Sequence, residues 1–198
     1  EIIWQGRPVH FRSPKDATDV GIATVYQDLA LADNLDIVQN MLLGHEVMSH
    51  GLLDEITMEQ TAKKTLADLR VTTVRNIRQP VGSLSGGQRQ AIAVAKAVML
   101  DAKLVIMDEP TAALGVSQTE LVLSLIERLA SRGIAVLVIS HNLTDVFRVA
   151  DRIAVLYLGQ MVSSGPVSNY DTASTVHWMT TGTAPNHGSA VIPNNAEG

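Results

Sequence analysis

The sequence predicts an α/β fold with a mostly parallel sheet and an inserted helical subdomain. Residues 104–107 and 134–139 are apolar throughout, and an amphipathic helical pattern lies between them. Strands of this kind separated by a helix are typical of βαβ units, in which a parallel sheet is covered on both faces. From residue 34 to residue 82 the spacing is instead helical, without a convincing strand.

Length and composition exclude several classes of protein. The sequence has 198 residues, a net charge of −5 and no cysteine. This length suits one domain, or one domain with a small subdomain. The acidic balance argues against a nucleic-acid-binding surface, and the lack of cysteine excludes disulfides and thiolate metal sites. Apolar runs of about six residues are far shorter than the roughly 18–20 that span a membrane.

The first 33 residues are predicted to form a hairpin and one strand of the sheet. Residues 2–4 and 8–11 flank a turn at Gly6, which is typical of a hairpin. Residues 21–26 form a short β-branched run that ends at Gln27. The sequence starts without Met or a basic leader, so we expect it to be part of a longer protein.

Helices are predicted before and after the second strand, residues 104–107, along the chain. Residues 34–43 and 58–70 have helical spacing, and a capping-box pattern, Thr57 with Gln60, precedes the second of them. Ser85 is an expected N-cap for a buried helix that runs to residue 100.

The helix after the second strand is predicted to begin at Ser117, which forms a capping-box pattern with Glu120, and to end at Arg132 and Gly133. Its expected buried face consists of Leu121, Val122, Leu125 and Leu129. A closing hairpin, residues 152–164, and a last helix, residues 172–181, would complete the chain.

These elements divide the sequence into four expected segments. Residues 1–33 would hold the hairpin and the first part of the α/β core, and residues 34–82 the inserted helical subdomain. Residues 83–182 would hold the rest of the core. Residues 183–198 are rich in Pro, Asn and Gly and are expected to be a disordered tail.

Polar side chains follow three predicted strands, at the edge where ligands bind in open parallel sheets. Gln27 follows the first strand, Asp108 and Glu109 the second, and His141 the third. One carboxylate can bind Mg²⁺ together with water and phosphate oxygens, and the other can orient or deprotonate a water. A nearby histidine can stabilise charge on a transferred phosphoryl group. Taken alone, an Asp-Glu pair at a strand end is more often solvated than catalytic.

A second group of residues stands at the start of the buried helix: Ser85, Gly86, Gly87 and Gln88. A serine cap followed by two glycines lets an anion approach the exposed amides at the positive end of the helix dipole. By itself this pattern is an ordinary cap, and it gains weight from the carboxylates at Asp108 and Glu109.

Together these motifs resemble those of ABC-transporter ATPases. Residues 84–88 match the LSGGQ signature, residues 104–110 the Walker B motif, Gln27 the Q-loop and His141 the switch histidine. The order and spacing match those of the family across residues 1–165. Two further stretches, residues 21–44 and 108–118, are similar to the branch that imports ribose, xylose or fructose.

The resemblance implies a P-loop NTPase-like ABC ATPase fold and a head-to-tail dimer of two cassettes with ATP and Mg²⁺ between them. The signature residues Ser85, Gly86, Gly87 and Gln88 would contact the nucleotide held by the partner cassette. Asp108 would coordinate Mg²⁺ and Gln27 would sense it, while Glu109 would polarise the attacking water. His141 would hold the γ-phosphate.

The resemblance also implies partners in a membrane. The helical segment after Gln27 would grip transmembrane permease subunits, which a sugar-binding protein would serve, and no nucleic acid would be involved. The protein would then lie at the cytoplasmic face of the cell membrane.

Two departures from the family pattern stand out. Gly115 replaces the usual carboxylate of the D-loop, and no Gly-x-x-x-x-Gly-Lys-[Ser/Thr] phosphate-binding loop occurs in the sequence. We therefore expect an N-terminally truncated fold that does not hydrolyse ATP alone. A non-hydrolysing module that contributes only its signature in trans is the alternative, and an ABC-fold ATPase outside transport is a third. Intact Glu109 and His141 favour the ATPase of a sugar importer.

Overall fold

The computed structural model describes residues 1–184. The chain divides into two compact units, Glu1–His141 and Asn142–Gly198, and each is described by itself. Most of the predicted tail, residues 185–198, lies outside the described residues. The division into four segments that the sequence suggests stays a prediction.

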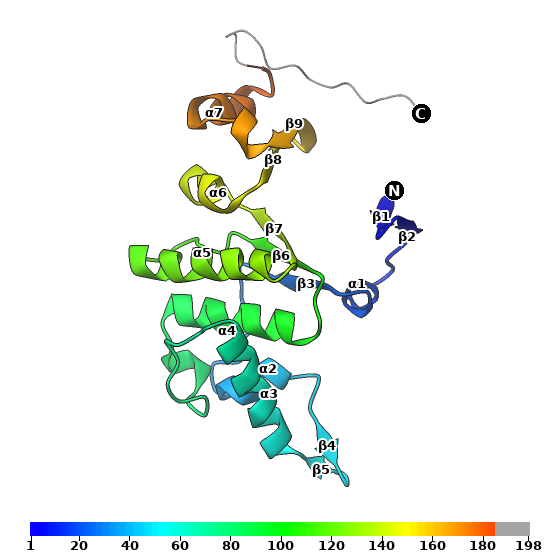
Figure 1. Ribbon diagram of the computed structural model, residues 1–198, viewed down its shortest axis with the longest axis vertical. Helices are drawn as coiled ribbons and strands as arrows, with labels where there is room; N and C mark the ends of the chain where they lie inside the picture. The colour runs from blue at the N-terminus through cyan, green and yellow to red at the C-terminus, as the bar shows by residue number, and fades with distance from the viewer. Residues whose placement is uncertain (185–198) are drawn as a thin grey trace. The chain divides into compact units, whose positions relative to one another are not determined.

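The first unit is built on the predicted parallel sheet. Its strands are β3 (Ile22–Val25), β6 (Leu104–Asp108) and β7 (Ala135–Ile139), in the order β3-β6-β7 (Figure 1). Both pairs are parallel, with Val25 beside Met107 and Met107 beside Val138. The central strand is the most buried, because Val105 and Met107 are fully enclosed. The α/β class with a parallel sheet is therefore confirmed.

The expectation that each strand is covered on both faces was wrong for β7. Leu137 and Ile139 are 51% and 50% exposed. Within residues 1–184, β7 pairs with β6 alone, and α5 (Val116–Ser131) packs against it. An apolar strand at an edge with a single helix beside it leaves alternate side chains uncovered.

The N-terminal hairpin has the predicted form. Strands β1 (Ile2–Trp4) and β2 (Arg7–Val9) pair antiparallel around Gln5 and Gly6, whose φ angles of 49° and 76° form a two-residue hairpin turn. A short helix that we did not predict, α1 (Pro14–Asp19), follows. Its signals are present in the sequence, since Ser13 caps it in a box with Asp16 and proline occupies its first turn.

The stretch from residue 34 to residue 82 contains α2 (Ile37–Leu42), α3 (Glu55–Asp68) and the short 3₁₀ helix η1 (Val81–Ser83). The predicted cap of the second helix was wrong. Asp54, rather than Thr57, caps α3, and its carboxylate accepts hydrogen bonds from the amide and hydroxyl of Thr57 at 3.0 and 2.7 Å. The aspartate thus starts the helix a turn earlier than the Thr57–Gln60 pattern suggested.

A small hairpin also occurs where we expected no strand. Strands β4 (Met48–Ser49) and β5 (Leu52–Leu53) pair around His50 and Gly51, which both have positive φ angles. The two-residue strands are too short to give a period-2 pattern, which explains why the sequence did not reveal them.

Helices α4 (Gly86–Met99) and α5 run side by side against the sheet (Figure 1). The predicted cap of α4 is confirmed: Ser85 and Gln88 form a reciprocal capping box. The predicted cap of α5 was wrong, because the helix begins at Val116 after Gly115, which offers no side-chain cap. Its buried residues are Val122, Leu123, Leu125, Ile126 and Leu129, whereas Leu121 is only partly buried.

The second unit contains the predicted closing hairpin and last helix. Helix α6 (Leu143–Val149) precedes strands β8 (Arg152–Tyr157) and β9 (Gln160–Pro166), the 3₁₀ helix η2 (Val167–Asn169) and helix α7 (Thr172–Thr181). Ile153, Val155 and Trp178 form its buried core. Across residues 1–184, no helix has both the length and the apolar character needed to cross a membrane.

One buried polar side chain organises the chain around α2. Asn40 is fully enclosed, and its side chain accepts a hydrogen bond from the amide of Ala32 at 2.8 Å. It also donates to the carbonyls of Ala32, Leu35 and Asp36 at 2.9 to 3.1 Å. These bonds fix residues 32–36 on the first turns of α2.

Replacing Asn40 with leucine should therefore destabilise the first unit by at least about 2 kcal/mol, because buried backbone groups lose their partners. Urea unfolding measures the change. The matched control is Asn34→Ala, at an exposed position, which should change the free energy of unfolding by less than about 0.5 kcal/mol. Equal stability of the two variants would contradict the assignment.

Candidate functional site

The parallel register brings the predicted catalytic positions to one edge of the sheet. Asp108, the last residue of β6, lies beside Ile139, the last residue of β7. The amide of Glu109 donates to the carbonyl of Ile139 at 2.8 Å and so extends the pairing beyond the strand. Gln27 follows the neighbouring β3 and His141 follows β7.

Glu109 and His141 are in direct contact. Oε1 of Glu109 lies 2.7 Å from Nδ1 of His141 and accepts a hydrogen bond from the His141 amide at 3.2 Å. The glutamate side chain is 20% exposed and the histidine side chain 77% exposed. A carboxylate that is largely covered and held by an accessible imidazole is suited to orienting a water or a phosphate oxygen.

The backbone at Glu109 is unusual. Its φ of +47° lies in the left-handed region, which non-glycine residues seldom occupy and which costs about 1–3 kcal/mol. Such strained residues cluster at active sites, where the surrounding structure imposes them. Because seven other non-glycine residues among residues 1–184 also have positive φ angles, a functional role for this turn rests on the Glu109–His141 contact rather than on the strain.

Asp108 has the properties of a ligand for a hard cation. In residues 1–184 its carboxylate has no hydrogen-bond or ion-pair partner, and the same is true of Gln27, which is exposed. Nowhere in this part of the chain do three or more His, Asp or Glu side chains gather as a metal cage. The unpartnered carboxylate of Asp108 suits Mg²⁺, which takes one or two carboxylates and completes its shell with water and phosphate oxygens.

The signature residues stand at the N-terminus of α4. Ser85 and Gln88 cap each other: the serine amide donates to Oε1 of Gln88 at 3.0 Å, and the Gln88 amide donates to the serine hydroxyl at 3.4 Å. Nε2 of Gln88 also donates to the carbonyl of Thr73 at 2.7 Å. The side chain of Gln88 therefore ties the start of the helix to the preceding loop.

Gly86 and Gly87 serve a packing role that the sequence did not reveal. A Cβ on Gly86 would lie 2.9 Å from the Leu114 side chain, and one on Gly87 would lie 2.9 Å from Cβ of Gln118. The close contact between α4 and the start of α5 therefore requires glycine at Gly87, where the backbone of Gln118 is also near, whereas at Gly86 the end of the Leu114 side chain could shift. Access for an anion, the reason inferred from sequence, stays a prediction; Gly86 is exposed and Gly87 is buried.

The two groups of residues do not meet in this chain. Among residues 1–184, no hydrogen bond or ion pair joins residues 85–88 to Gln27, Asp108, Glu109 or His141. Leu114, Gln118 and Thr73, which contact the signature, were missed, because contacts between distant segments leave no periodic pattern in the sequence.

A cavity of about 230 Å³ lies between β3 and α4. Its lining includes Tyr26, Leu29, His45 and Lys96. Burial lowers the pKa of Lys96, which has no hydrogen-bond or ion-pair partner in the described part of the chain.

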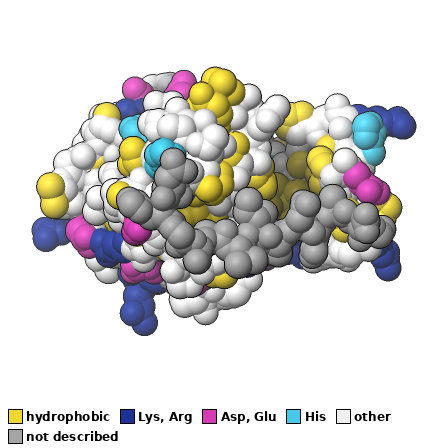
Figure 2. All heavy atoms as spheres, turned by 90° about the horizontal axis from the view of Figure 1, so that it is seen from above, with side chains coloured by type: hydrophobic (Ala, Val, Ile, Leu, Met, Phe, Trp, Pro, Cys, Tyr) yellow, Lys and Arg dark blue, Asp and Glu magenta, His cyan; other side chains and the backbone are white. Residues whose placement is uncertain are grey.

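The charges on the molecular face in Figure 2 are mixed, with Lys and Arg interspersed among Asp and Glu.

Sequence comparison finds similar proteins over most of the chain. A fructose import ATP-binding protein of Rhizobium meliloti is 46% identical over 187 residues, which cover 91% of this chain and 72% of that protein. A xylose/arabinose import ATP-binding protein of Sulfolobus acidocaldarius is 44% identical and covers 82% of this chain and 64% of that one. A ribose import ATP-binding protein of a Jannaschia species is 39% identical, and the match covers 34% of its length.

Solved structures share the fold. The cbiO1 subunit of a Clostridium perfringens ABC transporter aligns with a TM-score of 0.68 at 22% identity, covering 84% of this chain and 65% of that one. A dimeric ATP-binding cassette solved with ADP and phosphate aligns with a TM-score of 0.65 at 21% identity, covering 83% of this chain and 72% of that one. These alignments confirm the predicted ABC ATPase fold.

The family model described as ABC transporter matches residues 1–112. This match includes β3 with Gln27, the signature residues and the carboxylates at the end of β6. With the relatives above, it shows that this chain belongs to the ABC transporter family.

Proposed function

We propose that this chain is the greater part of an ATP-hydrolysing subunit that energises import of a monosaccharide. The observation that carries the proposal is the Glu109–His141 pair beside the unpartnered carboxylate of Asp108. The names of the relatives, which import fructose, xylose, arabinose or ribose, support the transport role.

The residues at the sheet edge divide the chemistry between them. Glu109 orients and polarises the attacking water, and the hydrogen bond to His141 holds its carboxylate in place. His141 contacts the γ-phosphate, and the large exposure of its side chain supports this role. Asp108 would hold Mg²⁺, with Gln27 beside it, and the bound ion would neutralise charge on the phosphates.

The signature residues act on a second nucleotide. Residues 85–88 would contact the nucleotide of a second cassette chiefly through Ser85 and Gly86, which are exposed. The dimeric cassette with ADP and phosphate supports such a pairing. The phosphate-binding loop, absent from these 198 residues, would be supplied by an upstream segment.

Permease subunits would dock on the helical segment after Gln27. The cavity beside Tyr26 and Lys96 lies next to this segment and offers apolar walls with one cationic group. Docking there would place the chain at the cytoplasmic face of the cell membrane, and a sugar-binding protein would act through the permease.

One observation favours a different function. Without a phosphate-binding loop in the sequence, the chain could only contribute its signature to an active partner. The Glu109–His141 contact argues against this alternative, since such a module has no use for a water-orienting carboxylate.

The first prediction concerns catalysis. In a polypeptide extended upstream through a phosphate-binding loop, Glu109→Gln should preserve Mg·ATP binding and lower kcat by about 10²–10⁴-fold, because the amide cannot accept a proton. Phosphate release and nucleotide titration measure the two effects. Asp101→Asn, the same change at an exposed position, is the control. Unchanged turnover in Glu109→Gln would refute the assignment.

The second prediction concerns docking. Charge reversal at the exposed Glu46, in the segment 34–46, should reduce sugar uptake while leaving ATP hydrolysis active, because the permease contact is lost. Uptake and hydrolysis are measured together in vesicles containing the assembled transporter. Glu127→Lys on the exposed side of α5 is the matched control. Normal uptake by Glu46→Lys would contradict docking at this segment.

A further inference from the structure

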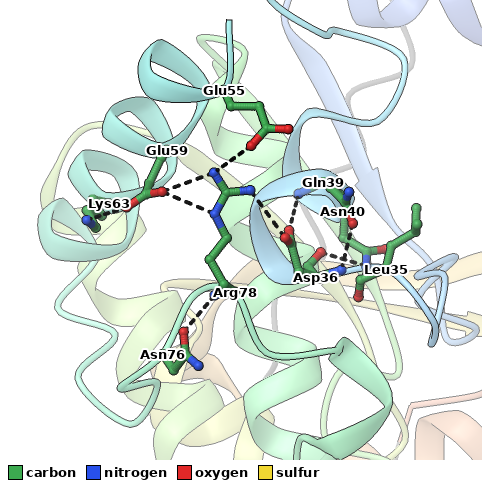
Figure 3. A network of polar contacts seen from close by, with 9 residues as sticks. All are labelled: Leu35, Asp36, Gln39, Asn40, Glu55, Glu59, Lys63, Asn76 and Arg78. Atoms are coloured by element: carbon green, nitrogen blue, oxygen red, sulfur yellow. Dashed lines mark hydrogen bonds and ion pairs between the residues drawn. The ribbon is translucent and has the colours of Figure 1, made fainter. Parts of the chain in front are cut away.

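Arg78 is the centre of a polar network that joins the helices of the inserted stretch. It lies in the irregular segment 70–80 that joins α3 to α4 (Figure 3). Its guanidinium contacts Asp36 at 3.3 Å, Glu55 at 3.3 Å and Glu59 at 3.0 Å. Asp36 is the N-cap of α2, whereas the two glutamates lie on α3. The side chain of Arg78 thus joins the start of α2 and helix α3 to the segment 70–80.

The charges of this network support one another. Burial lowers the pKa of Arg78, but hydrogen bonds to Glu59 and Asp36 outweigh it, and the net pKa is raised. Hydrogen bonds from Lys63 and Arg78 lower the pKa of Glu59. Both shifts favour the charged forms of Arg78 and Glu59, and so their ion pair.

The backbone beside Arg78 pairs with the segment that follows the Q-loop. The amide of Val81 donates to the carbonyl of Leu35, and the amide of Gly82 to that of Asp33, each at 3.0 Å. A Cβ on Gly82 would lie 3.1 Å from the Asp33 carbonyl oxygen, so the approach is close. Residues 33–36 and 80–82 therefore run alongside each other, in contact through their backbones.

A second arginine fastens the other end of this pairing. Arg89, in the first turn of α4, contacts Oδ1 of Asp33 at 2.7 Å. It directly follows Gln88, whose side chain holds the carbonyl of Thr73. The pairing is thus held by Arg78 at Asp36 and by Arg89 at Asp33.

We propose that Arg78 and Arg89 are positioning residues that lock residues 33–36 to the signature, so that the two segments move together. We call this arrangement, the two ion-pair sites with the backbone pairing between them, the clamp. Asn40 fixes residues 32–36 on α2. Through the clamp, these residues in turn hold Ser85 at the start of α4 in position. The proposal rests on the proposed function, in which the signature contacts the nucleotide of a second cassette.

The clamp matters because the segment that precedes the signature, residues 70–80, has little regular structure of its own. Residues 70–80 lack helix and strand, and Val71 is their only buried apolar side chain. Exposed ion pairs contribute little to global stability, but they restrict where such a loop lies. Small displacements of a group that contacts a reacting phosphate reduce the rate strongly.

Hydrogen exchange on the 198-residue chain tests whether the ion pairs hold the two segments together. In Arg89→Ala and Asp33→Ala, exchange at the amides of Val81 and Gly82 should rise about fivefold, while exchange in β6 stays unchanged. Lys64→Ala, which removes an exposed ion pair with Asp68, is the control and should alter neither. Unchanged exchange at Val81 and Gly82 in both clamp variants would overturn the proposal.

Turnover of the upstream-extended polypeptide tests whether the clamp positions the signature for ATP hydrolysis. Arg89→Ala should lower kcat by about 10- to 100-fold and leave the Kd for Mg·ATP within about twofold, because the nucleotide is held by another segment. The charge swap Asp33→Arg with Arg89→Asp should restore most of the rate, which a general loss of stability would not allow. Normal kcat in Arg89→Ala, or no rescue by the swap, would overturn the proposal.

A signature variant separates this proposal from the proposed function. Gly86→Asp places a carboxylate at the start of α4 and should abolish turnover. If Gly86→Asp turns over normally, the signature does not act on a nucleotide, and the proposed function and the clamp both fail. If Gly86→Asp is inactive and Arg89→Ala is normal, the clamp alone fails.

Discussion

The candidate site depends on one backbone hydrogen bond, from the amide of Glu109 to the carbonyl of Ile139. This bond continues the pairing of β6 and β7 after both strands have ended, so the chain turns at Glu109 while still held to its neighbour. The turn requires a left-handed backbone at a glutamate. The buried centre of β6, at Val105 and Met107, offsets that strain through the burial of apolar area.

The helix α4 satisfies two demands at its first turn. Its exposed amides are capped by Ser85, and its glycines admit Leu114 from the connection that follows the carboxylates and Gln118 from the first turn of α5. The chain thus links Glu109 to the signature through a short, tightly packed path. A larger residue at Gly87 would press on Gln118 and separate α4 from α5.

The sequence was informative where the signal is local. The apolar strands, the Ser85 cap and the polar residues at the strand ends could all be predicted, because each depends on neighbouring residues. The caps of α3 and α5 were mispredicted since two plausible caps stood close together, and only the backbone at Asp54 and Gly115 decides between them. The left-handed turn at Glu109 could not be predicted, because tertiary pairing imposes it.

The ion pairs of Arg78 and Arg89 could not be predicted from the sequence, for a different reason. Arg78 and Asp36 lie far apart in the chain, and nothing in their spacing predicts that they meet. Their placement follows from Asn40, a polar residue among apolar ones in α2 whose four hydrogen bonds shape residues 32–36. An apolar residue there would fill the space but leave those backbone groups unpaired. The buried amide therefore determines where both arginines find their partners.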